Sequence, residues 1–122
     1  MWIDFFSARP SSSGAELRRL IEESEPFALT GLVVAEVLQG LPRDPGRIEA
    51  LLGQWDLLEP HGIATWREAA RIFRAARSKG VSLRTIDTII AAIAIEHGAS
   101  LFTLDRDFAG IARVAPLKLH RF

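Results

Sequence analysis

The sequence contains no cysteine, which excludes disulfide bonds and thiolate-bound zinc. It also lacks an excess of charge of either sign, because Lys+Arg 15 balance Asp+Glu 15. Global electrostatics therefore indicate no partner, and a nucleic-acid ligand would need a local basic patch. No apolar run approaches the roughly 18 residues that suggest a membrane span, and no basic segment precedes an apolar leader. We expect a soluble, cytoplasmic protein.

The remaining composition is that of an ordinary globular domain, with 48% apolar and 25% charged residues in 122 positions. A chain of this length buries well over half of its unfolded surface. The polar stretch 7–14 has the character of a loop rather than a linker. We therefore expect one domain over residues 1–122.

Short strand-like runs alternate with helical patterns along the chain. Four short runs favour strands, at 27–30, 57–58, 99–104 and 117–122. Apolar spacing predicts helices at 13–24, 31–41, 47–55, 65–79, 85–98 and 105–112. In the helix at 65–79, the predicted inward residues are Trp66, Ala69, Ala70, Phe73 and Ala76. This alternation predicts an α/β sandwich with a parallel sheet, and ligands in such folds bind at the carboxyl ends of strands.

Four acidic residues occur beside apolar segments rather than on polar helix faces. Glu36 interrupts the apolar run LVVAEVL, and Asp87 lies in the first turn of the most apolar helix. Asp105 follows a strand directly, and Asp107 comes two residues later. Each has a structural alternative: Glu36 as a charge on the solvent side, Asp87 as a partner of the helix dipole, and Asp105 and Asp107 as capping residues.

Taken together, these acids predict a carboxylate cluster that needs a cation. Two like charges within about 4 Å repel by about 4 kcal/mol at an effective dielectric near 20. Oxygen-only ligands favour a hard ion, Mg²⁺ or Mn²⁺. Such an ion lowers the pKa of a coordinated water and stabilises charge on phosphoryl oxygens, as phosphodiester hydrolysis requires.

Basic residues gather around the helix at 65–79. They are Arg67, Arg71, Arg74, Arg77, Lys79 and Arg84. This stretch is either a solvated helix face or a phosphate-contacting rim. The three histidines, His61, His97 and His120, are scattered and show no nucleophile–base pairing, so covalent catalysis is not predicted.

Three segments in this order resemble the PIN-domain ribonucleases, and among them the VapC-type toxins of type II toxin–antitoxin systems. The segments are WIDFF at 2–6, TGLVVAEVLQGL at 30–41 and TIDTIIAAIAIEHGASLFTLDRDFAGIA at 85–112. The resemblance implies a three-layer α/β/α sandwich with a short parallel sheet. It also implies metal ligation by Glu36, Asp87 and Asp105, with Asp107 close by, and cleavage of RNA with Mg²⁺ or Mn²⁺. A VapB-type antitoxin and a homodimer are the partners that it implies.

One family feature is missing from the start of the sequence. In the family, a short apolar strand ending in the first metal-binding Asp precedes WIDFF, whereas here Met1 stands directly before Trp2. Asp4 matches the later acid of WIDFF and does not replace the missing one. The expectation is therefore an N-terminally truncated PIN-like domain that lacks its first strand. Either the true start lies upstream, or the chain is this short and is weakly stable and poorly active.

Two functions follow from these observations. The first is a Mg²⁺-dependent endoribonuclease toxin, with Glu36, Asp87, Asp105 and Asp107 as its catalytic residues. The alternative is a catalytically impaired PIN-like binding module that keeps its antitoxin or partner surface, an interpretation favoured by the missing Asp. Metal titration separates the two, because a nuclease binds Mn²⁺ and gains stability.

Overall fold

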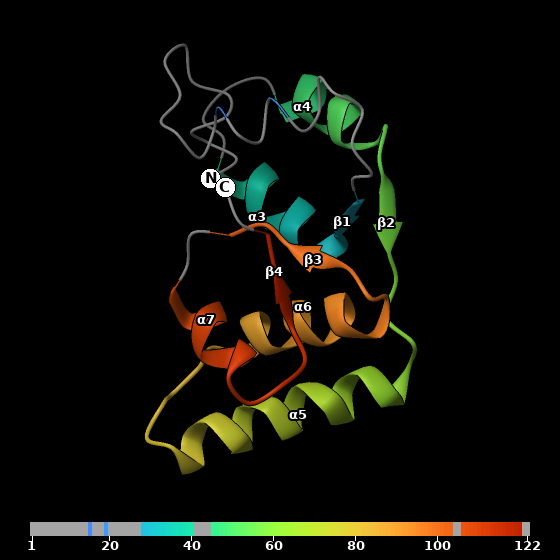
Figure 1. Cartoon of the computed structure of the whole chain (residues 1–122). Coiled ribbons are helices and arrows are strands. Elements are labelled where there is room, and N and C mark those ends of the chain that lie inside the picture. The colour runs from blue at the N-terminus through green and yellow to red at the C-terminus, as the bar shows by residue number, and fades with distance from the viewer. Residues whose placement is uncertain (1–14, 16–18, 20–27, 41–44, 104–105, 121–122) are drawn as a thin grey trace. The chain divides into compact units, whose positions relative to one another are not determined.

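The structure is a computed structural model that describes residues 15, 19, 28–40, 45–103 and 106–120 (Figure 1). The chain divides into two compact units, Met1–Leu57 and Leu58–Phe122. The helix predicted at 13–24 falls mostly outside the described residues, as does WIDFF.

The first unit is built around a short strand that leads directly into a helix. Strand β1 (Ala28–Thr30) pairs with β2 (Asp56–Leu58), and α3 (Gly31–Gly40) and α4 (Pro45–Leu52) contact each other. The buried Thr30 hydroxyl accepts a hydrogen bond from the Val33 amide at 3.2 Å, which caps the start of α3. The predicted strands at 27–30 and 57–58 and the helix at 31–41 are thus confirmed in type, with slightly different ends.

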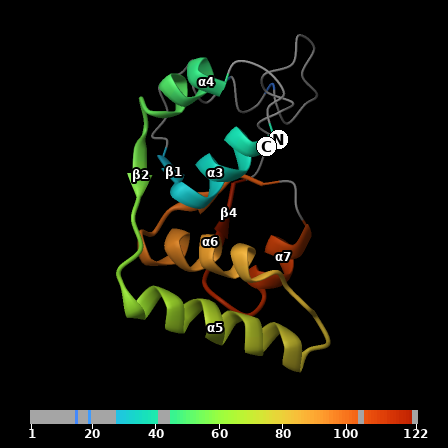
Figure 2. The same cartoon turned by 180° about the vertical axis from the view of Figure 1, so that it is seen from behind.

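The second unit is dominated by two adjacent helices, α5 (Ile63–Ser78) and α6 (Thr85–Glu96), which run antiparallel (Figure 2). Both helices end in the same way. Gly80 and Gly98 have φ of 80° and 63°, and the residues after them return amide hydrogen bonds to Ala76 and Ala94. A left-handed residue at this position favours glycine, which explains why each helix stops there.

Two short parallel strands and a last helix complete the second unit. Strand β3 (Ser100–Leu101) pairs in parallel with β4 (Lys118–Leu119), and α7 (Arg106–Ala112) lies between them in sequence. Helix α6 contacts α5, α7 and β3, so it lies at the centre of this unit. Its apolar character all round follows from that position. The core residues of the unit are Ala69, Ile72, Ala76, Leu83, Ile90, Ala91, Ala92, Ile93, Ala94, Phe108, Ile111 and Leu117.

The predicted inward face of α5 is partly wrong. Ala69 and Ala76 are buried as predicted and Phe73 is half-buried, but Trp66 is 45% exposed and Ala70 is exposed. The face that packs on α6 carries Thr65, Ala69, Ile72 and Ala76, which is rotated by about one residue from the predicted stripe. Thr65 takes the first buried position because its hydroxyl has partners in this unit.

Among the helices that the structure describes, none combines the length and apolarity needed to cross a membrane.

Candidate active site

Asp87 is the predicted site residue with the most distinctive surroundings. It is only 1% exposed, and both of its carboxylate oxygens accept hydrogen bonds from Arg84. The Nε–Oδ2 and Nη2–Oδ1 distances are each 3.0 Å. Such a two-pronged contact is the strongest common geometry between arginine and a carboxylate. The side chain of Arg84 is 64% exposed, so the pair joins a buried anion to a cation that reaches solvent.

The local backbone places this pair at the start of α6. Arg84 has extended angles, φ −77° and ψ 142°, at the N-cap position, and the amides of Asp87 and Thr88 donate to its carbonyl. Asp87 therefore lies in the first helical turn, where the unpaired amides and the helix dipole favour a negative charge. The structural role that the sequence suggested for Asp87 and its predicted role in ligand binding are compatible.

The other predicted acids lie on different elements. Glu36 is half-buried on α3 beside the buried Val37, in the first unit. Asp107 is half-buried in the first turn of α7, in the second unit with Asp87. Asp105 lies outside the described residues. The convergence of Glu36, Asp87, Asp105 and Asp107 in one metal site thus stays a prediction.

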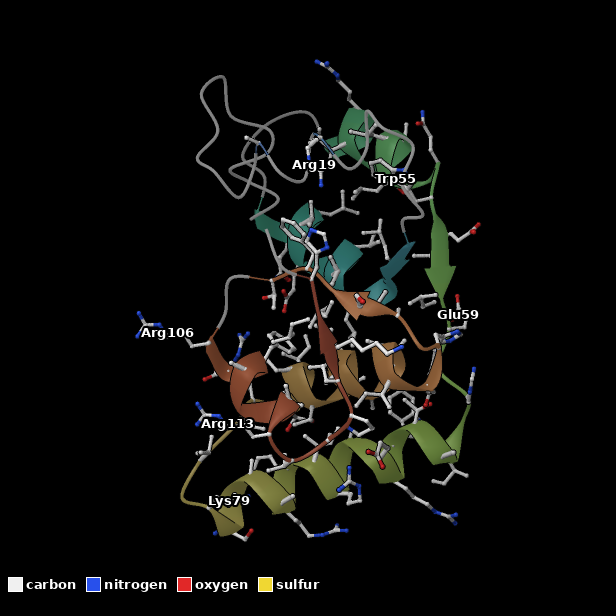
Figure 3. The ribbon with its side chains drawn as sticks, viewed as in Figure 1. Arg19, Trp55, Glu59, Lys79, Arg106 and Arg113 are labelled. Carbon is white, nitrogen blue, oxygen red and sulfur yellow. The ribbon has the colours of Figure 1, made fainter. Side chains whose placement is uncertain are left out.

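The basic side chains around α5 are all exposed: Arg67, Arg71, Arg74, Arg77, Lys79 and Arg84. Two of them have carboxylate partners. Arg84 holds Asp87, and Arg71 donates to Glu68 from Nε at 3.0 Å and from Nη2 at 2.6 Å. These hydrogen bonds from Arg71 lower the pKa of Glu68. Lys79 lies at the end of α5 (Figure 3).

An apolar hollow of about 410 Å³ lies beside this helix pair. Trp66, Phe73 and Ile89 contribute its largest apolar side chains, and Arg74 and Thr85 are also part of its wall. Trp66 and Ala70, which the sequence placed in the core, line this hollow instead.

A second group of charged and titratable side chains lies at the other end of α6. His61, Glu96 and His97 bring three potential metal ligands within 4.8 Å of one another, the one such group in the described part of the chain. Both histidines are evident in the sequence, but their scattered positions predict no shared site. His61 precedes α5 and His97 ends α6, so only the antiparallel packing of these helices brings them together. The sequence does contain two histidine–glycine pairs, His61-Gly62 just before α5 and His97-Gly98 just after α6.

Comparison with known proteins identifies the family. The family model described as "PIN domain" matches residues 1–114. The chain belongs to the PIN domain family. This match confirms the family that the three sequence segments indicated, and with it the α/β fold class of a PIN-like domain.

Individual PIN relatives match the chain over almost its entire length. VapC ribonuclease Mb1587 of Mycobacterium bovis and Ribonuclease VapC11 of Mycobacterium tuberculosis are each 37% identical over 125 residues. Each alignment covers 99% of this chain and 93% of the relative. The resemblance to VapC proteins is therefore confirmed at the level of sequence.

Solved structures share the same fold at lower identity. VapBC2 from Rickettsia felis, bound to a DNA fragment from its promoter, has a TM-score of 0.68 at 19% identity and covers 90% of this chain and 85% of its own. FitAcB from Neisseria gonorrhoeae has a TM-score of 0.64 at 21% identity and covers 94% and 88%. At these identities the likeness establishes the fold alone.

Proposed function

We propose that this PIN family protein is a metal-dependent endoribonuclease of the VapC type that hydrolyses RNA phosphodiesters. One observation carries the proposal. Proteins named VapC ribonucleases are 37% identical to this chain, and the alignment leaves almost none of it uncovered. A relationship over the full domain, rather than over one motif, favours a shared activity.

In this proposal Glu36, Asp87 and Asp105 hold one or two Mg²⁺ or Mn²⁺ ions, and Asp107 assists. Asp87 supplies a buried carboxylate whose charge is balanced by the Arg84 guanidinium, so a divalent ion would replace that contact. Oxygen-only donors match the preference of hard divalent ions. When bound, the ion supplies Lewis-acid activation of water and stabilises charge on phosphoryl oxygens.

The residues of the chain then have distinct tasks. Asp87 is held at the start of α6 by the helix and by Arg84, so its carboxylate is oriented before a ligand arrives. Arg84 balances its charge in the meantime. Since most of the Arg84 side chain is exposed, the guanidinium has room to turn into solvent or toward a phosphate. No side chain forms a covalent intermediate in this scheme, and a water attacks the phosphodiester in line.

Substrate binding is assigned to the exposed basic residues of the second unit. Arg77 lies in the last turn of α5 and Lys79 directly follows the helix. Among the described residues, no acidic side chain lies within hydrogen-bonding or ion-pair distance of either. Cations in this setting attract the RNA backbone without reading its sequence. We infer that they form part of a rim that steers RNA toward the acids.

The proposed partners are a VapB-type antitoxin, which would block the cleft, and a second copy of the chain in a homodimer. A cytoplasmic location accords with action on cellular RNA. The fold shared with the solved structures of VapBC2 and FitAcB supports the antitoxin assignment. The homodimer rests on the family resemblance.

Metal dependence of RNA cleavage tests the function. Purified protein is stripped with a chelator, incubated with a structured RNA, and resupplied with Mg²⁺, Mn²⁺ or Ca²⁺. We expect cleavage only with Mg²⁺ or Mn²⁺, since Ca²⁺ takes more ligands at longer distances. Cleavage that persists in the chelator contradicts the metal-dependent mechanism. Absence of both cleavage and Mn²⁺ binding would instead favour the alternative, a binding module.

A further inference from the structure

Two imidazoles and a carboxylate meet where the start of α5 lies beside the end of α6. Nδ1 of His61 is 3.5 Å from Oε2 of Glu96, and the rings of His61 and His97 have centroids 4.6 Å apart. The rings are tilted by 59° and so do not stack face to face. Donor atoms from all three residues lie within 4.8 Å of one another.

The separation between His61 and Glu96 matches that of two ligands around a small tetrahedral ion, and the other separations lie within 4.8 Å. Nitrogen and oxygen ligands bind zinc at about 2.0–2.2 Å, which places the ligand atoms roughly 3.3–3.6 Å from each other. The His61–Glu96 distance of 3.5 Å falls in that range. His61 and Glu96 are thus already spaced for a shared ion, and His97, whose donor atom lies within 4.8 Å of both, would move closer to complete the set. The exposed fraction of His61, 53% of its side chain, gives such an ion a route from solvent.

Glu96 is held in place by two uncharged donors, a hydroxyl and a backbone amide. The Thr65 hydroxyl donates to Oε1 at 2.5 Å, and the His61 amide is 3.1 Å from Oε2. Thr65 is fully buried, and its hydroxyl also accepts from the His61 amide at 2.7 Å. Partners of this kind around a ligating carboxylate are a usual feature of metal sites, because they fix the orientation of the ligand.

His97 is oriented by a backbone carbonyl. Its Nε2 is 2.8 Å from the carbonyl oxygen of Glu59, the residue labelled beside the end of α6 in Figure 3. A carbonyl only accepts, so Nε2 donates the hydrogen in this contact, and Nδ1 is the nitrogen that could bind an ion. Metal-binding histidines commonly donate their other nitrogen to a carbonyl in this way.

We propose that His61, Glu96 and His97 form a binding site for a transition-metal ion of the zinc class. Two nitrogen donors and one carboxylate suit Zn²⁺, Ni²⁺ or Co²⁺, whereas Mg²⁺ prefers oxygen ligands alone. A proton on His61 would satisfy Glu96 but would make no use of the second nitrogen of His97, the one not bonded to the Glu59 carbonyl. One divalent ion instead accepts a lone pair from each ring and neutralises the carboxylate.

This site differs from the proposed catalytic site in place and in chemistry. It joins the segment before α5 to the last turn of α6, while Asp87 lies in the first turn of α6. A bound ion would link the two helices at this end of the pair and stabilise their packing. The function assigned to the site is therefore structural, and it does not depend on the ribonuclease proposal.

Metal binding to the full chain tests the proposal. Zn²⁺, Ni²⁺ and Mg²⁺ are each titrated into chelator-treated protein by calorimetry, with melting temperature as a second readout and Co²⁺ absorption as a report of nitrogen ligation. His61→Ala removes a ligand but keeps the backbone amide that holds Glu96, and the exposed side chain makes misfolding unexpected. His120→Gln alters the third histidine, which instead lies against Phe102, and is the matched control.

We expect one Zn²⁺ per chain in the wild type and in His120→Gln, with a raised melting temperature and little response to Mg²⁺ at this site. His61→Ala and His97→Ala should each weaken Zn²⁺ binding at least tenfold. Asp87→Asn should leave Zn²⁺ binding unchanged. A wrong assignment of this site can therefore be told apart from a wrong assignment of the catalytic site. Absence of Zn²⁺ binding in the wild type, or equal binding by the His61→Ala/His97→Ala double variant, overturns the proposal.

Discussion

Arg84 and Asp87 form a two-pronged ion pair in which the carboxylate is buried and the guanidinium reaches solvent. They are three positions apart in the sequence, so the contact spans the first turn of α6. In the proposed enzyme, this guanidinium and a divalent ion are alternative partners for the same charge. Arg84 thus links the stability of the metal-free protein to its affinity for metal.

Replacing Arg84 should change the stability of the metal-free protein and its affinity for metal in opposite directions. Arg84→Gln leaves the Asp87 charge without its main partner, so we expect the free energy of unfolding without metal to fall by about 1.5 kcal/mol, the lower end of the range for hydrogen bonds to charged groups. Mn²⁺ affinity should rise, because a competing cation is gone. Chemical denaturation and Mn²⁺ calorimetry measure the two quantities. Arg106→Gln, at an exposed position of α7, is the charge-matched control (Figure 3). Unchanged Mn²⁺ affinity in Arg84→Gln would contradict the competition.

The rotated face of α5 makes a prediction about stability. Ile72 is 0% exposed, so Ile72→Ala should lower the free energy of unfolding by about 2–5 kcal/mol. Trp66, although larger, is 45% exposed, and Trp66→Ala should cost about 1 kcal/mol. Urea denaturation of both variants provides the comparison. If Trp66→Ala lowered the free energy of unfolding more than Ile72→Ala, the inward face predicted from the sequence would be supported instead.

Thr65 makes a prediction that holds with or without a bound metal. Thr65→Val keeps the shape of the side chain but removes the hydroxyl that bonds Glu96 and the His61 amide. We expect the free energy of unfolding to fall by about 1–3 kcal/mol, since the Glu96 carboxylate and the His61 amide each lose a hydrogen-bond partner. Thr65→Ser retains the hydroxyl and should therefore keep most of the stability that Thr65→Val loses. Equal melting temperatures for the valine and serine variants would exclude a stabilising role for this network.

RNA binding should depend on the charges at the end of α5. Charge reversal in the double variant Arg77→Glu/Lys79→Glu should weaken RNA affinity. It should also reduce the slope of log affinity against log salt by about 1 for each phosphate that the variant no longer neutralises. Lys118→Glu, at an exposed position of β4, is the control. Fluorescence anisotropy at several salt concentrations gives the slope. The same slope in both variants would leave Arg77 and Lys79 as ordinary surface charges.

The sequence predicts elements more reliably than it predicts which side chains they bury. The pattern at 85–98 matches α6, Thr85–Glu96, because glycine and an apolar sequence define both its end and its environment. The run at 99–104 predicts a longer strand, yet β3 is only Ser100–Leu101, because a strand extends only as far as its partner pairs with it. Pairing partners depend on tertiary structure and leave no local signal.

The same distinction applies to the sites. The pairing of Arg84 with Asp87 joins residues three positions apart, the N-cap and the first turn of α6, and is therefore a local contact. Burial of Thr65 is not predictable from the local pattern, because its carboxylate partner, Glu96, lies 31 positions away. His61 and His97 look isolated in the sequence for the same reason. Contacts across the helix pair appear only when its packing is known.

The most direct test of the catalytic assignment compares two aspartates in an RNA cleavage assay with saturating Mn²⁺. Asp87 is buried at the start of α6, whereas Asp56 is exposed on β2. We predict that Asp87→Asn lowers the cleavage rate by two orders of magnitude or more, on the order of the loss expected for one preorganised electrostatic group, while Asp56→Asn cleaves like the wild type. Circular dichroism confirms that both variants fold. Undiminished cleavage by folded Asp87→Asn would contradict the assignment of this carboxylate to the metal site.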